Sequence, residues 1–461
     1  MNKAVEISQL QIALVTISRP TFDVEFAQSM ADAVATSLAE AGHTIVGTGA
    51  ELLMDGGAAE DAIATLSGHT FDLAIILQAS FADSTMAVQI ARAIQPRDMP
   101  LLLWAVPEER SGSRLRLNSL CGINLAGHAF TRHGIAYDYL LAAPEDPEAL
   151  EKIAILARAG RARRLLREAR IGLVGQHPVG FDTCSYSSEA LATLFGAQIV
   201  PLPLQHALDR ARVAGVEQRE AFIQRVAEVT DNLDTLDQEG VAGTAGVYVA
   251  LREYADVEQL DGVAVRCWPE YFTELGCAAC GAMSMLNEEL TPASCEADVH
   301  GTLTLVLLQA LSNDQTFITD LVSVDATDDT ATLWHCGLAP ISMADPSVPI
   351  SATIHSNRQL PLLFEFPLRP GRITIARLSQ PHPDQGAAGF RLVVGGGEMV
   401  QAPRGFGGTC GTVRFDRPAT DVFDTVMREG LEHHFCIVYG DYLAELRAFA
   451  GLVDLPVLEL S

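Results

Sequence analysis

The chain has 461 residues, of which 48% are hydrophobic and 19% are charged, a balance typical of compact globular domains rather than of a disordered chain. This length exceeds what a single hydrophobic core commonly supports, so we expect more than one domain. The net charge of −27 at pH 7 argues against a nucleic-acid partner, because phosphate binding requires a basic surface.

The rare residue types narrow the function classes further. The only two lysines are Lys3 and Lys152, and neither belongs to a Gly-Lys-Ser/Thr motif, which disfavours P-loop enzymes and lysine Schiff-base enzymes. The nine cysteines have no framework spacing, the N-terminus lacks the apolar core of a signal peptide, and no apolar run approaches a membrane span of about 20 residues. We therefore expect a cytoplasmic protein with reduced thiols and no membrane partner.

The N-terminal part alternates short apolar runs with amphipathic segments. We predict strands at 11–18, 43–47, 71–79 and 100–106, with helices over 22–41 and near 87–94. Such strand–helix alternation predicts a parallel, doubly wound sheet. Its strand ends carry no Gly-x-Gly-x-x-Gly motif, so a dinucleotide site is not indicated.

A helix over 147–170, rich in arginine at its end, is predicted to connect this domain to a second strand–helix series. That series has predicted strands at 171–175, 198–204, 262–268 and 316–324, and a helix over 295–311. After about residue 342, prolines, glycines and short alternating runs indicate antiparallel β structure. We predict an α/β protein with two Rossmann-like doubly wound domains, 1–165 and 166–345, and a β-rich, barrel-like antiparallel domain, 346–461.

Acidic residues gather at the start of the predicted helix 295–311. A carboxylate at this place is often a helix cap, which is the simple interpretation of Glu296 or Asp298 taken alone. Two acids together with His300 in one turn favour a functional site. Because residues two apart point in different directions, we expect Glu296 to face a metal ion and Asp298 to act as the cap.

Two further candidates follow along the chain. Asp320 ends the β-like run 316–320, and open α/β sheets place ligands at the carboxyl ends of their strands. His335 comes 15 residues later, about the length of a β-hairpin, at the end of another apolar run. A lone histidine there would more often be a core residue, but its register with Glu296 and Asp320 makes it a candidate ligand.

The segment Glu432-His433-His434 supplies two more imidazoles. Neighbouring residues of an extended chain point to opposite faces, so we expect one histidine to bind metal and the other to pack or to bind substrate. We assign His434 to the metal and His433 to the substrate; two ordinary interface residues are the alternative. Carboxylates combined with imidazoles suit Mn²⁺ or a similar divalent ion such as Mg²⁺ or Co²⁺.

Weaker signals surround this set. Arg266 and Trp268 end a predicted strand at the same sheet edge, and we assign both to substrate binding. Arg266 would contact a polyol or anionic substrate, or else form an internal ion pair. Gln176 lies in a loop that could hold an anionic group. Cys277 and Cys280 have no second cysteine pair, so we assign them a buried apolar role rather than a zinc site. The glycines at 395–397 and 405–411 are predicted to form β turns.

Taken together, several segments resemble the L-fucose isomerase/L-arabinose isomerase superfamily, especially its shorter fucose-isomerase-like branch. These segments are 261–270, 295–301, 317–320, 334–337, 432–434 and 439–441. The resemblance implies Mn²⁺ held by Glu296, Asp320 and His434, and His335 matches the additional ligand of the arabinose-isomerase type. It also implies a trimeric or hexameric assembly in which neighbouring subunits complete the site.

We therefore expect a metal-dependent aldose–ketose isomerase that acts on a sugar through a cis-enediolate intermediate. Glu296 would be base and ligand, and Asp320 would be ligand and partner acid or base. The alternatives are an epimerase or metal-dependent lyase for a modified, anionic sugar, and a catalytically silent sugar-binding relative. The sequence leaves the identity of the sugar open.

Overall fold

The computed structural model describes residues 9–110, 112 and 114–461. The chain forms two compact units. Of the described residues, the first contains 9–165 and the segment Arg447–Leu452, and the second contains Leu166–Leu446 and Val453–Ser461. The finer division into three domains with boundaries at 165/166 and 345/346 stays a prediction.

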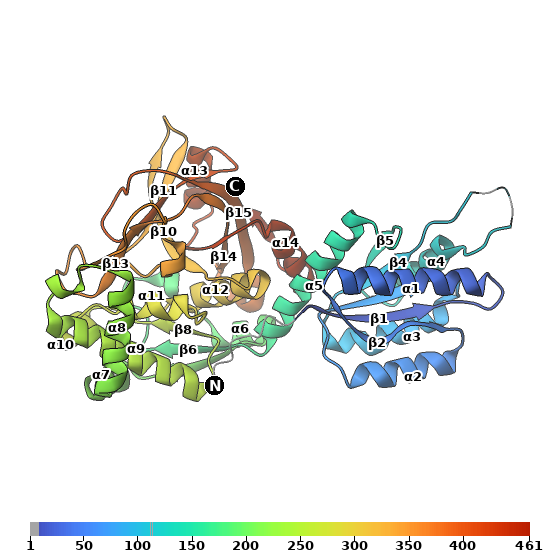
Figure 1. Cartoon of the computed structure of the whole chain (residues 1–461), viewed down its shortest axis with the longest axis horizontal. Coiled ribbons are helices and arrows are strands. Elements are labelled where there is room, and N and C mark those ends of the chain that lie inside the picture. The colour runs from blue at the N-terminus through green and yellow to red at the C-terminus, as the bar shows by residue number, and fades with distance from the viewer. Residues whose placement is uncertain (1–8, 111, 113) are drawn as a thin grey trace. The chain divides into compact units, whose positions relative to one another are not determined.

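The first unit is a five-stranded parallel sheet of order β2-β1-β3-β4-β5. Its strands are β1 (Gln11–Ile17), β2 (Thr44–Leu53), β3 (Leu73–Gln78), β4 (Leu101–Ala105) and β5 (Asp138–Leu141). Its helices are α1 (Val24–Glu40), α2 (Gly56–Ser67), α3 (Ser84–Ile94), η1 (Gln95–Arg97), α4 (Ser119–Arg132) and α5 (Pro147–Arg167). One core packs α1 and α5 on one face of the sheet, and another packs α2, α3 and α4 on the other face (Figure 1). This is the doubly wound arrangement predicted by the strand–helix alternation.

The second unit begins with a four-stranded parallel sheet of order β7-β6-β8-β9. Its strands are β6 (Arg170–Val174), β7 (Gln198–Leu202), β8 (Gly262–Val265) and β9 (Ala293–Ser294). The segments that connect or follow these strands contain η2 (Asp182–Cys184), α6 (Ser188–Phe195), α7 (Leu204–Val213), α8 (Val216–Val229), η3 (Leu233–Thr235), α9 (Gln238–Glu258), α10 (Glu270–Leu275), α11 (Cys280–Glu288) and α12 (Val299–Ser312). Strand β8 is wholly buried, as expected of a central parallel strand with an apolar sequence.

A nine-stranded sheet of order β12-β13-β16-β11-β10-β17-β14-β15-β18 completes the unit. Its strands are β10 (Phe317–Asp325), β11 (Thr330–His335), β12 (Ser351–Thr353), β13 (Leu363–Pro367), β14 (Gly371–Ser379), β15 (Arg391–Val400), β16 (Thr409–Phe415), β17 (His434–Tyr439) and β18 (Val457–Glu459). The same region contains η4 (Ile341–Met343), η5 (Pro383–Gly389), α13 (Ala419–Arg428) and α14 (Leu443–Leu452). Because β15 also pairs with β16, the strands β16, β11, β10, β17, β14 and β15 close into an antiparallel barrel. The predicted fold class is confirmed, including the barrel-like β region.

Helix α12 joins the two sheets of this unit. It packs against β8 of the parallel sheet and against β14 and β17 of the barrel, and nearly all of its side chains are buried. A helix that is apolar all round must be covered on every side, which the sheet and the barrel achieve together. The N-terminus of α12 therefore lies where the two sheets meet.

Two local predictions need correction. The helix predicted over 295–311 begins only at Val299, because Asp298 caps it. Gly395, Gly396 and Gly397 lie inside β15 rather than in a turn. A side chain on Gly397 would come within 2.7 Å of the Arg414 carbonyl of the neighbouring strand.

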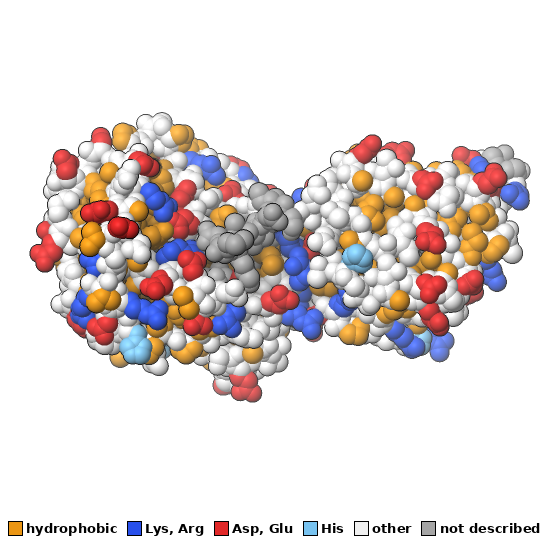
Figure 2. Space-filling view, turned by 60° about the horizontal axis from the view of Figure 1, so that its bottom comes forward, with side chains coloured by type: hydrophobic (Ala, Val, Ile, Leu, Met, Phe, Trp, Pro, Cys, Tyr) orange, Lys and Arg blue, Asp and Glu red, His pale blue; other side chains and the backbone are white. Residues whose placement is uncertain are grey.

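In the part of the chain that the structure describes, no helix has the length and apolarity needed to cross a membrane. On the face shown in Figure 2, acidic and basic side chains are interspersed.

Candidate metal and substrate site

A buried ion pair fixes the start of α12. Asp298 accepts a hydrogen bond from the backbone N–H of Gly301 at 2.8 Å, and its two oxygens lie 2.5 and 3.0 Å from the guanidinium of Arg377 on β14. Both side chains are fully buried. Burial raises the pKa of Asp298, but the charge of Arg377 and the hydrogen bond with His434 outweigh it and hold that pKa far below its ordinary value. Asp298 is the predicted cap, and it is ionised.

The Asp298 carboxylate also orients His434, the first residue of β17. The His434 Nδ1 lies 2.9 Å from Asp298 Oδ2. An ionised carboxylate only accepts, so Nδ1 carries the proton and the lone pair of His434 belongs to Nε2. That Nε2 atom lies 3.8 Å from Glu296 Oε2 and 3.7 Å from Asp320 Oδ1. A carboxylate that holds the far nitrogen of an imidazole is the usual support of a metal-binding histidine.

Glu296 lies in the loop before α12 rather than in the helix. Glu296 and Ala297 both have left-handed backbone conformations, with φ of 60° and 57°, which are costly for residues other than glycine. The Ala297 N–H donates to the Val265 carbonyl at the end of β8, and Cys295 Sγ lies 2.7 Å from Cys267 Sγ. These contacts tie the loop to the parallel sheet. Local propensity predicts a helix here, and these tertiary contacts override it.

Two N–H groups hold the carboxylate of Glu296. His433 Nε2 lies 3.0 Å from Oε2, and the Trp268 indole donates to Oε1 at 3.1 Å. Burial raises the pKa of Glu296, but the hydrogen bonds from His433 and Trp268 bring this pKa below its ordinary value. Glu296 is therefore ionised at neutral pH, with a fixed orientation.

Asp320 and His335 come from two neighbouring strands of the barrel. The predicted hairpin is confirmed, since β10 and β11 pair with Asp320 opposite Trp334. On the other side Asp320 is directly opposite His434 of β17. Asp320 thus lies within an antiparallel strand, not at the carboxyl end of a parallel one as predicted. Its side chain reaches the site because the register places it beside His434.

Two buried polar atoms in this cluster lack a protein partner. Among the described residues, Asp320 Oδ1 and His335 Nε2 have no hydrogen-bond partner, although both atoms are buried. Leaving buried polar atoms unpaired costs about 1–3 kcal/mol each, so such atoms commonly face a ligand, an ion or water. The rings of His335 and His434 are stacked with centroids 5.7 Å apart. However, the His335 Nδ1 accepts the Cys336 N–H at 2.9 Å, which leaves the proton of a neutral ring on Nε2.

His433 occupies a place that differs from the prediction. Its ring centroid is only 3.9 Å from that of His434, and both rings contact Glu296. The expectation of opposite faces is wrong because His433 lies at a bend before β17, where strand alternation does not apply. Its Nδ1 lies 2.8 Å from the Thr183 hydroxyl. Its contact with Glu296 raises the pKa of His433 against the lowering effect of burial.

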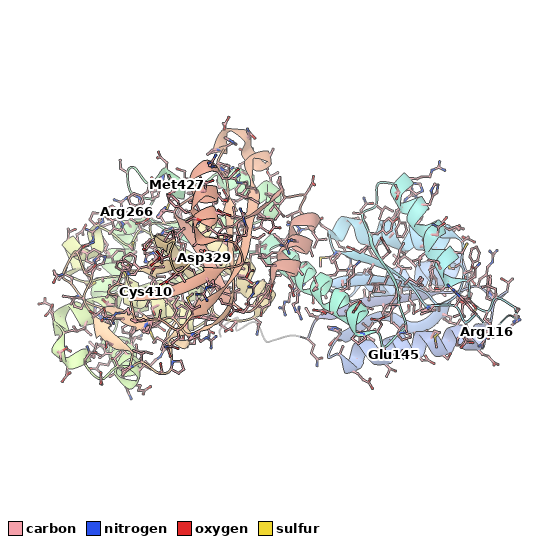
Figure 3. The ribbon with its side chains drawn as sticks, turned by 90° about the horizontal axis from the view of Figure 1, so that it is seen from above. Arg116, Glu145, Arg266, Asp329, Cys410 and Met427 are labelled. Atoms are coloured by element: carbon pink, nitrogen blue, oxygen red, sulfur yellow. The ribbon has the colours of Figure 1, made fainter. Side chains whose placement is uncertain are left out.

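Arg266, which is labelled in Figure 3, was predicted to contact an anionic or polyol substrate or to form an internal ion pair, and it is paired with the carboxylate of Glu270. Its Nε and one terminal nitrogen each lie 2.9 Å from a different oxygen of Glu270, and the other terminal nitrogen donates to the Gln176 carbonyl at 3.2 Å. The structure therefore has the internal ion pair that was the alternative interpretation. The Gln176 side chain is exposed, and it is the backbone of this residue that contacts Arg266.

Potential metal-binding atoms form two overlapping groups. One contains Cys184, Glu296, His433 and His434, and the other contains Asp320, His335 and His434, with the ligand atoms of each group within 4.8 Å of one another. Burial raises the pKa of the Cys184 thiol well above its ordinary value, so this residue is a neutral thiol and a poor ligand for hard cations. Glu296 and Asp320 fall in different groups and have His434 in common. Carboxylates together with an imidazole nitrogen are the ligand types that suit a divalent ion such as Mn²⁺.

The sequence alone did not reveal Arg377, Thr183 or Cys184. Arg377 could have been recognised from the sequence, because it is the one charged residue within the apolar stretch 373–378. A charge that is buried in such a strand requires a partner. Thr183 and Cys184 have no such signal, since they lie in the short 3₁₀ helix η2 between β6 and α6. Cys277 and Cys280 are buried, as predicted.

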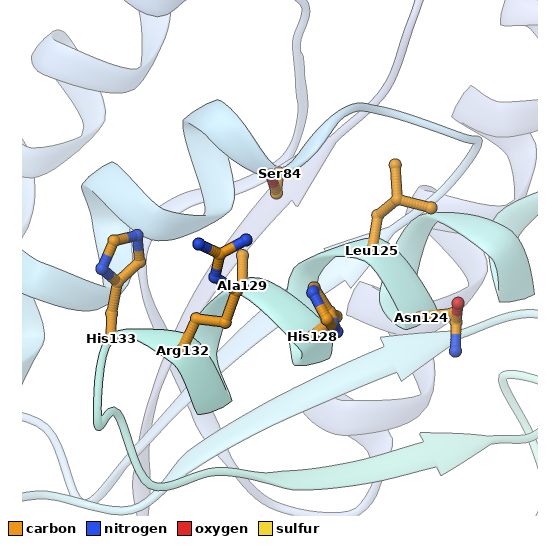
Figure 4. A pocket seen from close by; sticks show the side chains of 7 residues that line it. All are labelled: Ser84, Asn124, Leu125, His128, Ala129, Arg132 and His133. Carbon is orange, nitrogen blue, oxygen red and sulfur yellow. The ribbon is translucent and has the colours of Figure 1, made fainter.

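The first unit has a pocket of its own, with a volume of about 520 Å³ (Figure 4). Its lining is Ser84, Asn124, Leu125, His128, Ala129, Arg132 and His133. None of the residues predicted to bind metal or substrate contributes to this pocket. It is therefore separate from the cluster around His434.

Comparison with known proteins defines the class of the protein. A family model described as the N-terminal domain of fucose/sulfoquinovose isomerases matches residues 13–167. A sulfoquinovose isomerase of Alkalicoccus urumqiensis is 32% identical over 84% of this chain and 86% of its own length. Those of Clostridium sp. (strain MSTE9) and Priestia aryabhattai are 30% and 28% identical, over 97% and 96% of this chain and 99% and 98% of their own.

With this fold and this similarity, the protein is an isomerase, an intramolecular oxidoreductase that interconverts aldose and ketose sugars. It belongs to the fucose isomerase-like family. The resemblance stated from the sequence is thereby confirmed.

Proposed function

We propose that this enzyme interconverts sulfoquinovose, a glucose-like aldose with a sulfonate on C6, and the corresponding ketose. The observation that carries the choice of substrate is the similarity to several sulfoquinovose isomerases, which for two of those above extends over nearly the whole of both chains. The observation that carries the chemistry is that Glu296 and Asp320 each approach His434 Nε2, at 3.8 and 3.7 Å.

We further propose that Glu296, Asp320 and His434 hold one divalent cation, Mn²⁺ or a similar ion such as Mg²⁺ or Co²⁺. When bound, the ion supplies Lewis-acid stabilisation of the negative charge that develops on the oxygens of C1 and C2. Support comes from the unpaired Asp320 Oδ1 and from the Asp298 contact that leaves His434 Nε2 with its lone pair. We assign His335 the role of a hydrogen-bond donor to a sugar oxygen rather than that of a fourth ligand, because its Nδ1 already accepts a backbone N–H.

The protons then move between two adjacent carbons. One carboxylate removes the proton from C2 of the open-chain aldose, which gives the cis-enediolate. A proton is returned to C1, and the proton of the C2 hydroxyl passes to the C1 oxygen, so that the C2 oxygen becomes the carbonyl. We assign proton removal to Glu296, which is ionised and held by His433 and Trp268, and assign Asp320 as the partner acid or base. The trimeric or hexameric assembly implied by the resemblance is part of the proposal and is checked by light scattering.

The test combines metal analysis with solvent exchange. We expect purified protein to bind about one divalent ion per chain. NMR in D₂O with Mn²⁺ should show formation of the ketose, with deuterium incorporated at C1 of the ketose or at C2 of the remaining sulfoquinovose. Exchange without ketose formation would favour an epimerase, and cleavage products would favour a lyase. No reaction with sulfoquinovose under any metal condition would overturn the proposed substrate.

The Glu296→Gln variant tests the catalytic role. We expect kcat to fall by at least ~10²-fold, the usual contribution of a general base, because an amide cannot accept the proton. Glu289→Gln, which removes a carboxylate paired with Arg225, is the matched control. Wild-type turnover by Glu296→Gln with metal bound would show that another residue is the base.

A further inference from the structure

A substrate that carries a sulfonate requires a cation at the end of the site remote from C1 and C2. Three arginines contact the residues around the cluster: Arg266, Arg358 and Arg377. Arg377 is fully buried and bound to both oxygens of Asp298, and Arg266 is bound to both oxygens of Glu270. Each of these guanidinium groups already has a carboxylate with which to form paired hydrogen bonds.

Arg358 is different. Its guanidinium carbon lies 4.9 Å from the centre of the Trp268 ring and 5.0 Å from that of Phe272, distances at which a cation is attracted to an aromatic face. Among the residues that the structure describes, no carboxylate lies within ion-pair distance of Arg358. Its side chain is exposed. In a chain with a net charge of −27, a cation near a site without an acidic partner requires an explanation.

The loop between β12 and β13 presents this side chain in a defined turn. The His355 N–H donates to the Leu360 carbonyl at 2.9 Å, and the Gln359 N–H donates to the His355 carbonyl at 2.8 Å. The His355 ring packs edge-on against Phe272 at 5.2 Å. Burial and the charge of Arg358 lower the pKa of His355 to about 4. His355 is therefore neutral at neutral pH, and Arg358 carries the positive charge of this turn.

Trp268 connects Arg358 to the catalytic cluster. The edge of the indole donates to Glu296, while its face carries the guanidinium. Phe181 packs edge-to-face with Trp268 at 5.3 Å and contacts His433 at 5.9 Å, so aromatic rings line the space beside Glu296. A sugar whose C1 and C2 lie at Glu296 and Asp320 can therefore extend its remaining carbons along Trp268 toward Arg358.

We propose that Arg358 binds the anionic substituent of the sugar and makes the enzyme selective for anionic over neutral substrates. This inference rests on the proposed function and names the residue that recognises its substrate class. A guanidinium donates two parallel hydrogen bonds to two oxygens of one anion, a geometry that a sulfonate accepts and a hydroxymethyl group does not. Stacking on Trp268 and Phe272 limits the orientations of the guanidinium before the sugar arrives, which reduces the ordering cost of binding.

The test compares Arg358→Gln and Arg358→Lys with wild type on sulfoquinovose and on quinovose, the same sugar without the sulfonate. For Arg358→Gln we expect the KM for sulfoquinovose to rise ~10–100-fold, the effect of losing a charge-assisted pair of hydrogen bonds, and the kcat/KM ratio of sulfoquinovose to quinovose to fall by a similar factor. Arg358→Lys should recover part of this loss, because lysine keeps the positive charge but cannot donate two parallel hydrogen bonds. Because salt screens charge–charge attraction, the KM for sulfoquinovose should rise with ionic strength more strongly in wild type than in Arg358→Gln.

The matched control is Arg428→Gln, which removes an exposed arginine paired with Asp424 on α13. Thermal unfolding of each variant separates a folding defect from a binding defect. An unchanged KM for sulfoquinovose in Arg358→Gln, or an equal loss with both sugars, would overturn this inference and leave the proposed function intact. Inactivity of wild type toward sulfoquinovose would instead overturn the proposed substrate and this inference with it.

Discussion

The two ends of the candidate site differ in how their charges are satisfied. At the barrel end, Asp298, Arg377 and His434 are buried and bonded to one another, so each has one orientation. At the other end, Arg358 is exposed and lies over the rings of Trp268 and Phe272, with no acidic partner among the residues that the structure describes. Proton transfer and metal binding require fixed geometry, whereas recognition of a mobile anionic tail requires a free cation. The difference suggests that chemistry and selectivity are divided between the two ends.

The largest effect is expected from Asp298→Asn at the buried end. Removing this charge leaves Arg377 buried without an anion, which costs about 3–5 kcal/mol and lowers the temperature of thermal unfolding. Loss of the ionic contact with His434 Nδ1 should also weaken Mn²⁺ binding ~10–100-fold. Calorimetry and metal titration measure the two effects.

Asp424→Asn is the matched control for this change, because Asp424 forms an exposed ion pair with Arg428. Its stability should change by less than about 1 kcal/mol. If Asp298→Asn were as stable as this control and bound Mn²⁺ normally, the buried end would not be the rigid support described above.

A smaller effect is expected from Trp268→Phe, at the boundary between the two ends. Phenylalanine keeps an aromatic face for Arg358 but cannot donate to Glu296. We expect kcat to fall ~10-fold, about the value of one hydrogen bond to a charged group, with the KM for sulfoquinovose within ~2-fold of wild type. Steady-state kinetics on both sugars separates these effects.

Trp104→Phe is the control, since it removes an indole donor to the Ala142 carbonyl in the first unit. Its kcat per folded protein should equal that of wild type. A rise in KM without a change in kcat for Trp268→Phe would mean that the indole N–H serves binding rather than the orientation of Glu296.

The smallest effect is expected from Arg266→Gln. Because this guanidinium is bonded to Glu270 and to a backbone carbonyl, we expect the KM for sulfoquinovose to remain within ~2-fold and the stability to fall by about 1 kcal/mol or less. Glu270→Gln breaks the same pair and should have a similar effect. A tenfold rise in KM for Arg266→Gln alone would restore the anion-binding role that the sequence predicts for Arg266.

Much of the fold could be predicted because its signals are local. Alternating strands and helices predict the parallel sheets, and short alternating runs with glycine and proline predict the antiparallel barrel. The spacing of Asp320 and His335 predicts their hairpin, and the position of Asp298 predicts its cap. Each of these features depends on residues close together in the chain, whose conformational preferences can be read from the sequence.

The arrangement of the site was decided by contacts between distant residues. Asp298 and Arg377 are 79 positions apart, and Glu296 and His433 are 137 apart. Such contacts also explain the left-handed conformation of Glu296 and the bend at His433, which both differ from the preference of their local segments. They also decide between the two interpretations of Arg266, which forms the internal ion pair. The sequence by itself thus determined the elements and the kinds of ligand. Only the tertiary structure decided which atoms face one another, because packing free energy outweighs local propensity where the sheet, α12 and the barrel meet.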